Sequence, residues 1–159
     1  AAAVQTVHTG ISHEAYGIVY EMEDIWLTAR LLSGRKLWYP YATATQRAMP
    51  WDETDIRPSF TYCAKKMGIW KTIDAFGGLL VENVVQGLAR DLMVTAMFKC
   101  EKNGLPINLT VHDEIVTEPE KQNADPKALI QIMTDIPDWA KEIQVPVQVE
   151  AWSGDRYKK

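Results

Sequence analysis

The segment "INLTVHDEIVTE", residues 107–118, sets the most specific expectation about the fold. Two runs rich in β-branched and apolar residues flank His112, Asp113 and Glu114, which predicts a β-hairpin with these polar residues at its tip. Tight hairpin turns favour Asn-Gly, Asp-Gly or Gly-X, because glycine and asparagine tolerate a positive φ. The tip contains neither glycine nor asparagine. A local rule that fails inside a consistent pattern is typical of strained or functional sites.

The faces of this hairpin follow from strand alternation. A two-residue turn at His112-Asp113 or at Asp113-Glu114 gives one apolar face and one polar face. We expect the apolar face to pack on helices and the polar face to stay open. The apolar face would hold Ile107, Leu109, Val111 and Val116, and the polar face Asn108, Thr110, His112 and Thr117.

The neighbouring segments predict helices around this hairpin. Apolar residues from Val81 to Met97 recur at helical spacing, which predicts a long helix over about 80–103. Asp125-Pro126 is typical of a helix start, and that helix should end near Asp135, before Pro137. Alternation over 145–151 then predicts a strand.

The first half of the sequence favours strands. Strands are expected between residues 17 and 41, a loop over the proline-rich and acidic segment 47–59, and a short hairpin around Gly68. The whole pattern predicts an α+β fold in which helices cover one face of an antiparallel sheet. We expect a β-rich part over 1–79 and a helix-hairpin-helix-strand part over 80–159, joined in one compact unit.

Composition limits the classes of protein to consider. The 159 residues, with 47% hydrophobic and 24% charged residues, are typical of one globular domain. No apolar run reaches the ~20 residues of a membrane helix, and the N-terminus does not resemble a signal peptide. Two isolated cysteines, Cys63 and Cys100, favour a reducing, intracellular setting. A net charge of −4 gives no general attraction to nucleic acid.

The hairpin tip carries two adjacent carboxylates beside a histidine. Carboxylate oxygens suit Mg²⁺, which keeps several waters and bridges to substrate phosphates. A pair of Mg²⁺ ions ~3.5–4 Å apart can activate a hydroxyl and stabilise a leaving phosphate, but this needs carboxylates from more than one strand. A solvated acidic turn is the alternative interpretation of Asp113 and Glu114. Zinc is disfavoured, because His112 has no partner at the spacing of zinc motifs.

Two further groups of residues are candidates for nucleic-acid contact. Asn83, Gln86 and Arg90 fall within a ~60° arc of the long helix, and their donors suit acceptors in the DNA minor groove. Arg35 and Lys36 follow the turn at Ser33-Gly34, where they could contact phosphates. For both groups the alternative is a solvated surface.

Four quoted segments carry a resemblance to a known family. "ENVVQGLARDLMVTAMFKCEKNG", "LPINLTVHDEIVTE" and "VPVQVEAWSGDRY" resemble, in this order, the C-terminal palm of family A (DNA polymerase I-like) DNA polymerases in their phage-type branch. "LLSGRKLWYP", residues 31–40, resembles the segment between the fingers and the long helix of that family. The resemblance covers most of the chain from about Leu31 onward.

The resemblance implies roles for individual residues. Asp113 would be a catalytic ligand of Mg²⁺, Glu114 the neighbouring carboxylate, and His112 would approach the primer terminus. Gln86 matches a glutamine that reads the minor groove near the primer end. Bacterial members usually carry asparagine four residues earlier, where this chain has Glu82.

The resemblance also implies missing parts. The family needs a second palm aspartate, in a segment of the type DxSxxELR, and a fingers helix of the type KxxxFGxxYG, and neither is present here. We therefore expect the C-terminal part of a full-length or split DNA-directed DNA polymerase, inactive alone. Its partners would be primer-template DNA, deoxynucleoside triphosphates held mostly by the missing part, and that N-terminal part itself. The expected location is the cytoplasm of a bacterium or phage host, without membrane contact.

Two other functions stay open at this point. One is a DNA-binding accessory module that kept a palm-like shape and lost its chemistry. The other is an unrelated Mg²⁺-dependent phosphoesterase, which requires a second carboxylate cluster near Asp113. The acidic run "DETD", residues 52–55, is the one candidate, and it is expected in a loop.

Overall fold

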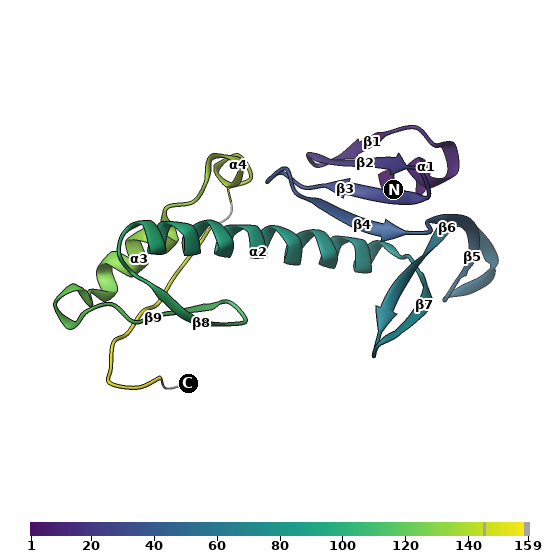
Figure 1. Cartoon of the computed structure of the whole chain (residues 1–159). Coiled ribbons are helices and arrows are strands. Elements are labelled where there is room, and N and C mark those ends of the chain that lie inside the picture. The colour runs from purple at the N-terminus through teal and green to yellow at the C-terminus, as the bar shows by residue number, and fades with distance from the viewer. Residues whose placement is uncertain (145, 158–159) are drawn as a thin grey trace. The chain divides into compact units, whose positions relative to one another are not determined.

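The computed structural model describes residues 1–144 and 146–157 (Figure 1). The chain divides into two compact units, residues 1–88 and residues 89–159, and the boundary falls inside helix α2 (Gly77–Lys102). The α+β class predicted from the sequence is confirmed. In place of one sheet, the described residues form three separate antiparallel sheets, together with four α-helices.

A four-stranded antiparallel sheet forms the first part of unit 1, with its strands in chain order (Figure 1). The strands predicted between residues 17 and 41 are confirmed as β2 (Ile18–Glu23), β3 (Trp26–Arg30) and β4 (Lys36–Pro40). They follow α1 (Ala2–Thr9) and β1 (His13–Ala15). Alternation places Leu27 and Ala29, both fully buried, on the face toward the core. Trp26 and Trp38 lie on the other face, with ring centroids 5.8 Å apart.

A three-stranded sheet follows, and it corrects the predicted loop over 47–59. That segment forms the end of β5 (Thr43–Met49) and the first half of β6 (Asp52–Lys66), while β7 (Ile69–Asp74) completes the expected hairpin around Gly68. Pro50 lies in the turn between β5 and β6. Pro58 pairs with Gln46 of β5, but β7 pairs only with residues 61–66, so no strand on that side requires an amide N–H from Pro58.

The core of unit 1 is aromatic. Tyr39 of β4 meets Phe60 and Tyr62 of β6 edge-to-face, with ring centroids 6.5 Å and 5.1 Å away. Leu80 from the start of α2 joins the same cluster. Gly87 allows α2 to lie close to Leu31, directly after the end of β3, because a Cβ at position 87 would be 2.9 Å from the Leu31 side chain. Glycine is typical of such close approaches.

Unit 2 contains the second half of α2 and the elements that follow it. These are the hairpin strands β8 (Ile107–Val111) and β9 (Glu114–Thr117), a 3₁₀ turn at Lys121–Asn123, α3 (Pro126–Thr134) and α4 (Asp138–Lys141). Helix α2 ends before Gly104, which has a φ of 75°, and the Leu105 amide donates to the Cys100 carbonyl. The predicted start of α3 is confirmed, since the Asp125 carboxylate accepts from the Lys127 amide and Pro126 is its first residue.

Two predictions for unit 2 are wrong. The face expected to pack is only partly covered, since Leu109 is 43% exposed and Val111 and Val116 are half-buried. The buried hairpin side chain is Ile115, which pairs with Thr110 of the expected polar face. An irregularity between Ile107 and Leu109 shifts the register there. The strand expected over 145–151 begins at Val145, which lies outside the described residues, and residues 146–151 form no strand. Alternating apolar and polar residues do not form a β-strand unless a partner strand supplies the backbone hydrogen bonds.

Candidate functional site

The tip of the β8–β9 hairpin is a two-residue turn at His112-Asp113, because Val111 and Glu114 are directly paired. His112 has a φ of 54°. The turns at Tyr16-Gly17 and Met67-Gly68 place glycine at their second position with a positive φ. Histidine tolerates the left-handed region better than most residues, yet glycine would fit it without steric cost. The residue types at this tip are therefore not those that turn geometry alone favours.

The three tip side chains are exposed, and their surroundings distinguish the two carboxylates. The Tyr157 hydroxyl donates a hydrogen bond to Glu114 Oε2 at 2.5 Å. This bond to a carboxylate raises the pKa of Tyr157 above its ordinary value. Within the part of the chain that the structure describes, Asp113 makes no hydrogen bond or ion pair. Both carboxylate oxygens of Asp113 are therefore available to a ligand, whereas Glu114 Oε2 already accepts a hydrogen bond from Tyr157.

The tip fits part of a Mg²⁺ site. Residues 1–144 and 146–157 contain no group of three or more histidine, cysteine, aspartate or glutamate side chains arranged to hold a metal ion. The tip contributes at most the two adjacent carboxylates of Asp113 and Glu114. Mg²⁺ commonly binds through one or two carboxylates, waters and substrate phosphates, so the donor type fits and the donor number is incomplete.

The polar residues predicted on the long helix have different surroundings. Asn83 is half-buried, and its Nδ2 donates to the Tyr39 hydroxyl at 3.4 Å within unit 1. Gln86, also in unit 1, is exposed. Arg90 belongs to unit 2, is exposed, and its Nη1 lies 3.5 Å from the Met93 sulfur. Gln86 is therefore the member of this group whose polar atoms are best presented to a ligand.

Arg35 and Lys36 both make contacts inside unit 1. The Arg35 Nη2 donates to the Gly87 carbonyl at 2.8 Å, which connects the turn before β4 to α2. Lys36 pairs with Glu23 and lies over the Trp38 ring, 5.9 Å from its centroid. These contacts give both side chains a structural role, and contact with phosphates stays a prediction.

Tyr157 was missed by the sequence analysis. It lies in a short polar tail with no helical or strand periodicity. Its hydrogen bond joins residues 43 positions apart, so local pattern could not reveal it. Tyr157 is the last residue of the quoted segment "VPVQVEAWSGDRY", and its place there was the one available signal.

Comparison with known proteins gives two relatives. The chain is 30% identical over 145 residues to the "DNA polymerase" of Bacillus phage SP02, which covers 91% of this chain and 21% of that protein. It is 36% identical over 75 residues to the "DNA polymerase I, thermostable" of Thermus aquaticus, which covers 45% of this chain and 9% of that protein. The chain is therefore distantly similar to two DNA polymerases, and to the phage protein over most of its own length.

The likeness to family A polymerases concerns a limited part of those proteins. The chain spans about a fifth of the length of the phage polymerase, 21%. No family model and no solved structure matches the chain significantly. The two sequence matches alone confirm the resemblance expected from the quoted segments. Among the described residues, no helix is long and apolar enough to cross a membrane.

Proposed function

We propose that the chain forms one part of a DNA-directed DNA polymerase and contributes Asp113 and Glu114 to its metal site. The observation that carries this proposal is the position of the two carboxylates at an exposed hairpin tip in a chain related to family A polymerases over 91% of its length. The remaining carboxylate, the nucleotide contacts and most of the primer-template contacts belong to residues outside this chain.

Each tip residue has its own role in this proposal. Asp113 offers its oxygens to Mg²⁺, because no described side chain occupies them. Glu114 is held by Tyr157 through one oxygen and supports the site through the other. His112 is exposed at the same turn, where it would approach the primer terminus. Bound Mg²⁺ would lower the pKa of the attacking hydroxyl and neutralise charge on the leaving phosphate.

Gln86 and its neighbours contribute to binding of primer-template DNA. Gln86 is exposed on α2, so its amide can donate to the N3 of adenine or the O2 of thymine in the minor groove. Asn83 already donates to Tyr39, which leaves it a smaller part in DNA contact. Arg90, Arg35 and Lys36 would add positive charge toward phosphates.

Primer extension tests the proposal. The polypeptide encoded by the complete reading frame should extend a primer with Mg²⁺, and Asp113→Ala should lower the rate by roughly 10³-fold, since a metal ligand acts mainly on the transition state. Glu114→Ala should cost less. The isolated chain should bind Mg²⁺ weakly and fail to extend a primer, because two carboxylates do not complete the site.

Asp138→Ala is the matched control, because Asp138 is an exposed carboxylate of unit 2 that pairs with Lys141 away from the tip. Extension by Asp138→Ala should equal that of the wild type. Full activity in Asp113→Ala would refute the metal-ligand role. Retained binding of primer-template DNA without any extension by the complete polypeptide would favour the DNA-binding accessory module instead.

A further inference from the structure

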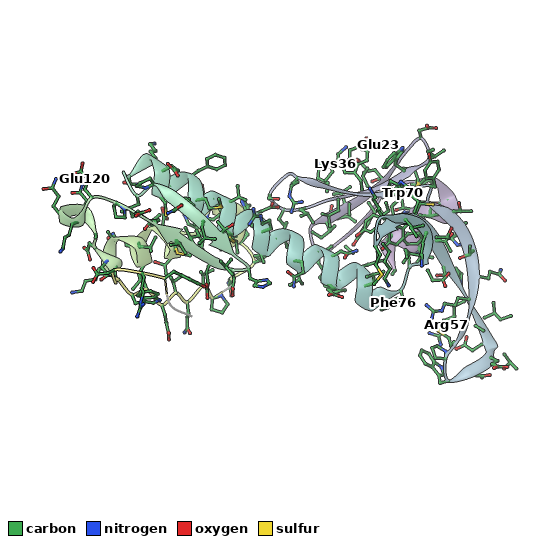
Figure 2. The ribbon with its side chains drawn as sticks, turned by 60° about the horizontal axis from the view of Figure 1, so that its bottom comes forward. Glu23, Lys36, Arg57, Trp70, Phe76 and Glu120 are labelled. Atoms are coloured by element: carbon green, nitrogen blue, oxygen red, sulfur yellow. The ribbon has the colours of Figure 1, made fainter. Side chains whose placement is uncertain are left out.

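A groove in unit 1 is lined by α1, by the paired strands β5 and β6, and by the start of α2. Its volume is about 720 Å³, within the range of ligand-binding pockets. The lining is mostly apolar, with two arginines and two exposed aromatic side chains: Arg47, Arg57, Trp51 and Phe76. Figure 2 shows Arg57 on the β5–β6 strands and Phe76 near the start of α2. We call this surface the Arg47–Trp51 groove.

The two arginines are an unusual cross-strand pair. Arg47 of β5 and Arg57 of β6 are directly opposite each other in the ladder. Like charges at such positions destabilise a sheet, so an anion bound between the two guanidinium groups would reduce the repulsion between them. This placement points to a negatively charged ligand rather than to packing.

Asp55 satisfies only part of this charge. It accepts from Arg57 Nε at 3.1 Å and from Nη2 at 2.6 Å, which orients the guanidinium. The pair lowers the pKa of Asp55 below its ordinary value. The Arg47 side chain makes no hydrogen bond or ion pair with the described residues. One guanidinium is therefore fixed in place, and the other is available to a phosphate.

Aromatic side chains stand beside the arginines. Trp51, in the turn between β5 and β6, is 71% exposed, and Phe76 is 53% exposed. The Arg57 guanidinium lies 5.8 Å from the Trp51 ring centroid, which holds the indole next to the charged pair. Aromatic rings next to arginine are the combination that stacks unpaired bases while binding the phosphates between them.

We propose that the Arg47–Trp51 groove binds an unpaired stretch of single-stranded DNA. A base stacks on Trp51 or Phe76, and a phosphate accepts from Arg47 and from the remaining N–H groups of Arg57. The proposal rests on the proposed function in that DNA is the expected partner of a polymerase part. It adds a separate binding surface that needs neither Asp113 nor a metal ion.

Fluorescence anisotropy with a labelled oligothymidylate of about 12 nucleotides tests this on the isolated chain, because such sites span ~4–16 nucleotides. Trp51→Ala should weaken binding on the order of tenfold, and Trp51→Phe should restore part of it because a ring remains. Arg47→Ala should weaken binding and reduce the salt dependence by about one phosphate contact, whereas Arg47→Lys should keep the salt dependence.

Two controls separate this site from others. Trp70→Ala removes a tryptophan that is 62% exposed on β7, outside the groove lining, and should bind normally. Asp113→Ala should also bind normally, so loss of polymerase activity and loss of this site are distinguishable. Circular dichroism checks that each variant folds.

Three results would overturn the proposal. They are no measurable binding of the single strand by the folded chain, unchanged binding in both Arg47→Ala and Trp51→Ala, or tighter binding of a duplex of the same length. The last result would mean that the groove recognises the DNA backbone without reading unpaired bases.

Discussion

The two units differ in how their interiors are built. Unit 1 packs aromatic side chains between strands and a helix, with Phe60 fully buried and Tyr39 and Tyr62 around it. Among the described residues of unit 2, the buried ones carry no aromatic ring; they are Ala96, Cys100, Leu105, Ile115 and Ala140. A two-stranded hairpin is marginal without packing against other elements. The unit with the carboxylates therefore has the thinner core, and the unit with the larger core presents Gln86 and the Arg47–Trp51 groove.

The first prediction tests whether the core of unit 1 can be destabilised without destabilising unit 2. Phe60→Ala should lower the free energy of unfolding of unit 1 by ~3–5 kcal/mol, because it removes a fully buried ring and leaves a cavity. Amide hydrogen exchange should show lost protection in β2, β3 and β6. Protection of β8 and β9 should change much less, because they belong to the other unit.

Ile115→Ala is the reciprocal variant, since Ile115 is the buried side chain of the unit 2 hairpin. It should reduce protection in β8 and β9 and leave the four-stranded sheet protected. Equal losses across the whole chain in both variants would show that the two units unfold as one, against the division described above.

The second prediction uses pH to separate the units. Burial raises the pKa of Tyr39 to about 12, and burial also raises the pKa values of Tyr20 and Tyr62. The unfolded chain therefore loses these protons at lower pH than the folded chain. The stabilisation is complete below pH ~10 and is lost as the pH rises toward 12, by ~2–3 kcal/mol for Tyr39.

The alkaline experiment follows tyrosinate absorbance and hydrogen exchange together. Unit 1 should open first, because burial raises the pKa values of three of its tyrosines, whereas in the described part of unit 2 burial is the main cause of a raised pKa only for the Cys100 thiol. Tyr39→Phe should flatten the pH dependence of unit 1. A pH dependence that is identical in this variant would assign the effect to other groups.

The same comparison explains what the sequence could and could not predict. Strands β2, β3 and β4 were predicted, because their alternation and the turns at Asp24 and Gly34 agree. The prolines and acids of segment 47–59 predict a loop, because these residues disfavour strands in general, whereas Pro50 lies in a turn and Pro58 lies where one side of β6 has no partner. Composition cannot show which side of a strand is paired.

The candidate site was predictable only in part. The position of His112, Asp113 and Glu114 at a hairpin tip followed from the sequence, and pairing of Val111 with Glu114 agrees with it. The apolar residues predicted along the long helix are less buried than their spacing suggests, since Val81 and Val85 are 63% and 56% exposed. The contact of Tyr157 with Glu114 joins residues far apart in the sequence, and the opposition of Arg47 and Arg57 depends on the register of the β5–β6 pair. Periodicity encodes neither.

The third prediction concerns DNA contact by unit 1. Gln86→Ala in the complete polypeptide should lower primer extension about fivefold, and more beyond a mismatch, because it removes one minor-groove hydrogen bond of ~1 kcal/mol. The melting temperature should not change, since Gln86 is exposed. Glu82→Ala, exposed on the same helix, serves as the control. Unchanged extension in Gln86→Ala would leave Gln86 as a solvated residue.

The fourth prediction has the smallest effect and addresses the carboxylates of unit 2. The Tyr157 hydroxyl donates to Glu114 Oε2, where it would compete with a metal ion bound at the proposed site, so Tyr157→Phe should free that oxygen. Binding of Mn²⁺, used as a probe for Mg²⁺, should tighten about twofold in the isolated chain, because an exposed hydrogen bond contributes little. Tyr41→Phe, an exposed tyrosine of unit 1, should leave Mn²⁺ binding unchanged.

Double variants decide whether this effect passes through Glu114. The gain from Tyr157→Phe should persist in an Asp113→Ala background and disappear in a Glu114→Gln background, because only the latter removes the carboxylate that Tyr157 contacts. Line broadening by Mn²⁺ should meanwhile stay centred on the amides of residues 112–114. Weaker Mn²⁺ binding in Tyr157→Phe would reverse the role assigned to Tyr157, which would then orient Glu114 toward the metal instead of competing for it.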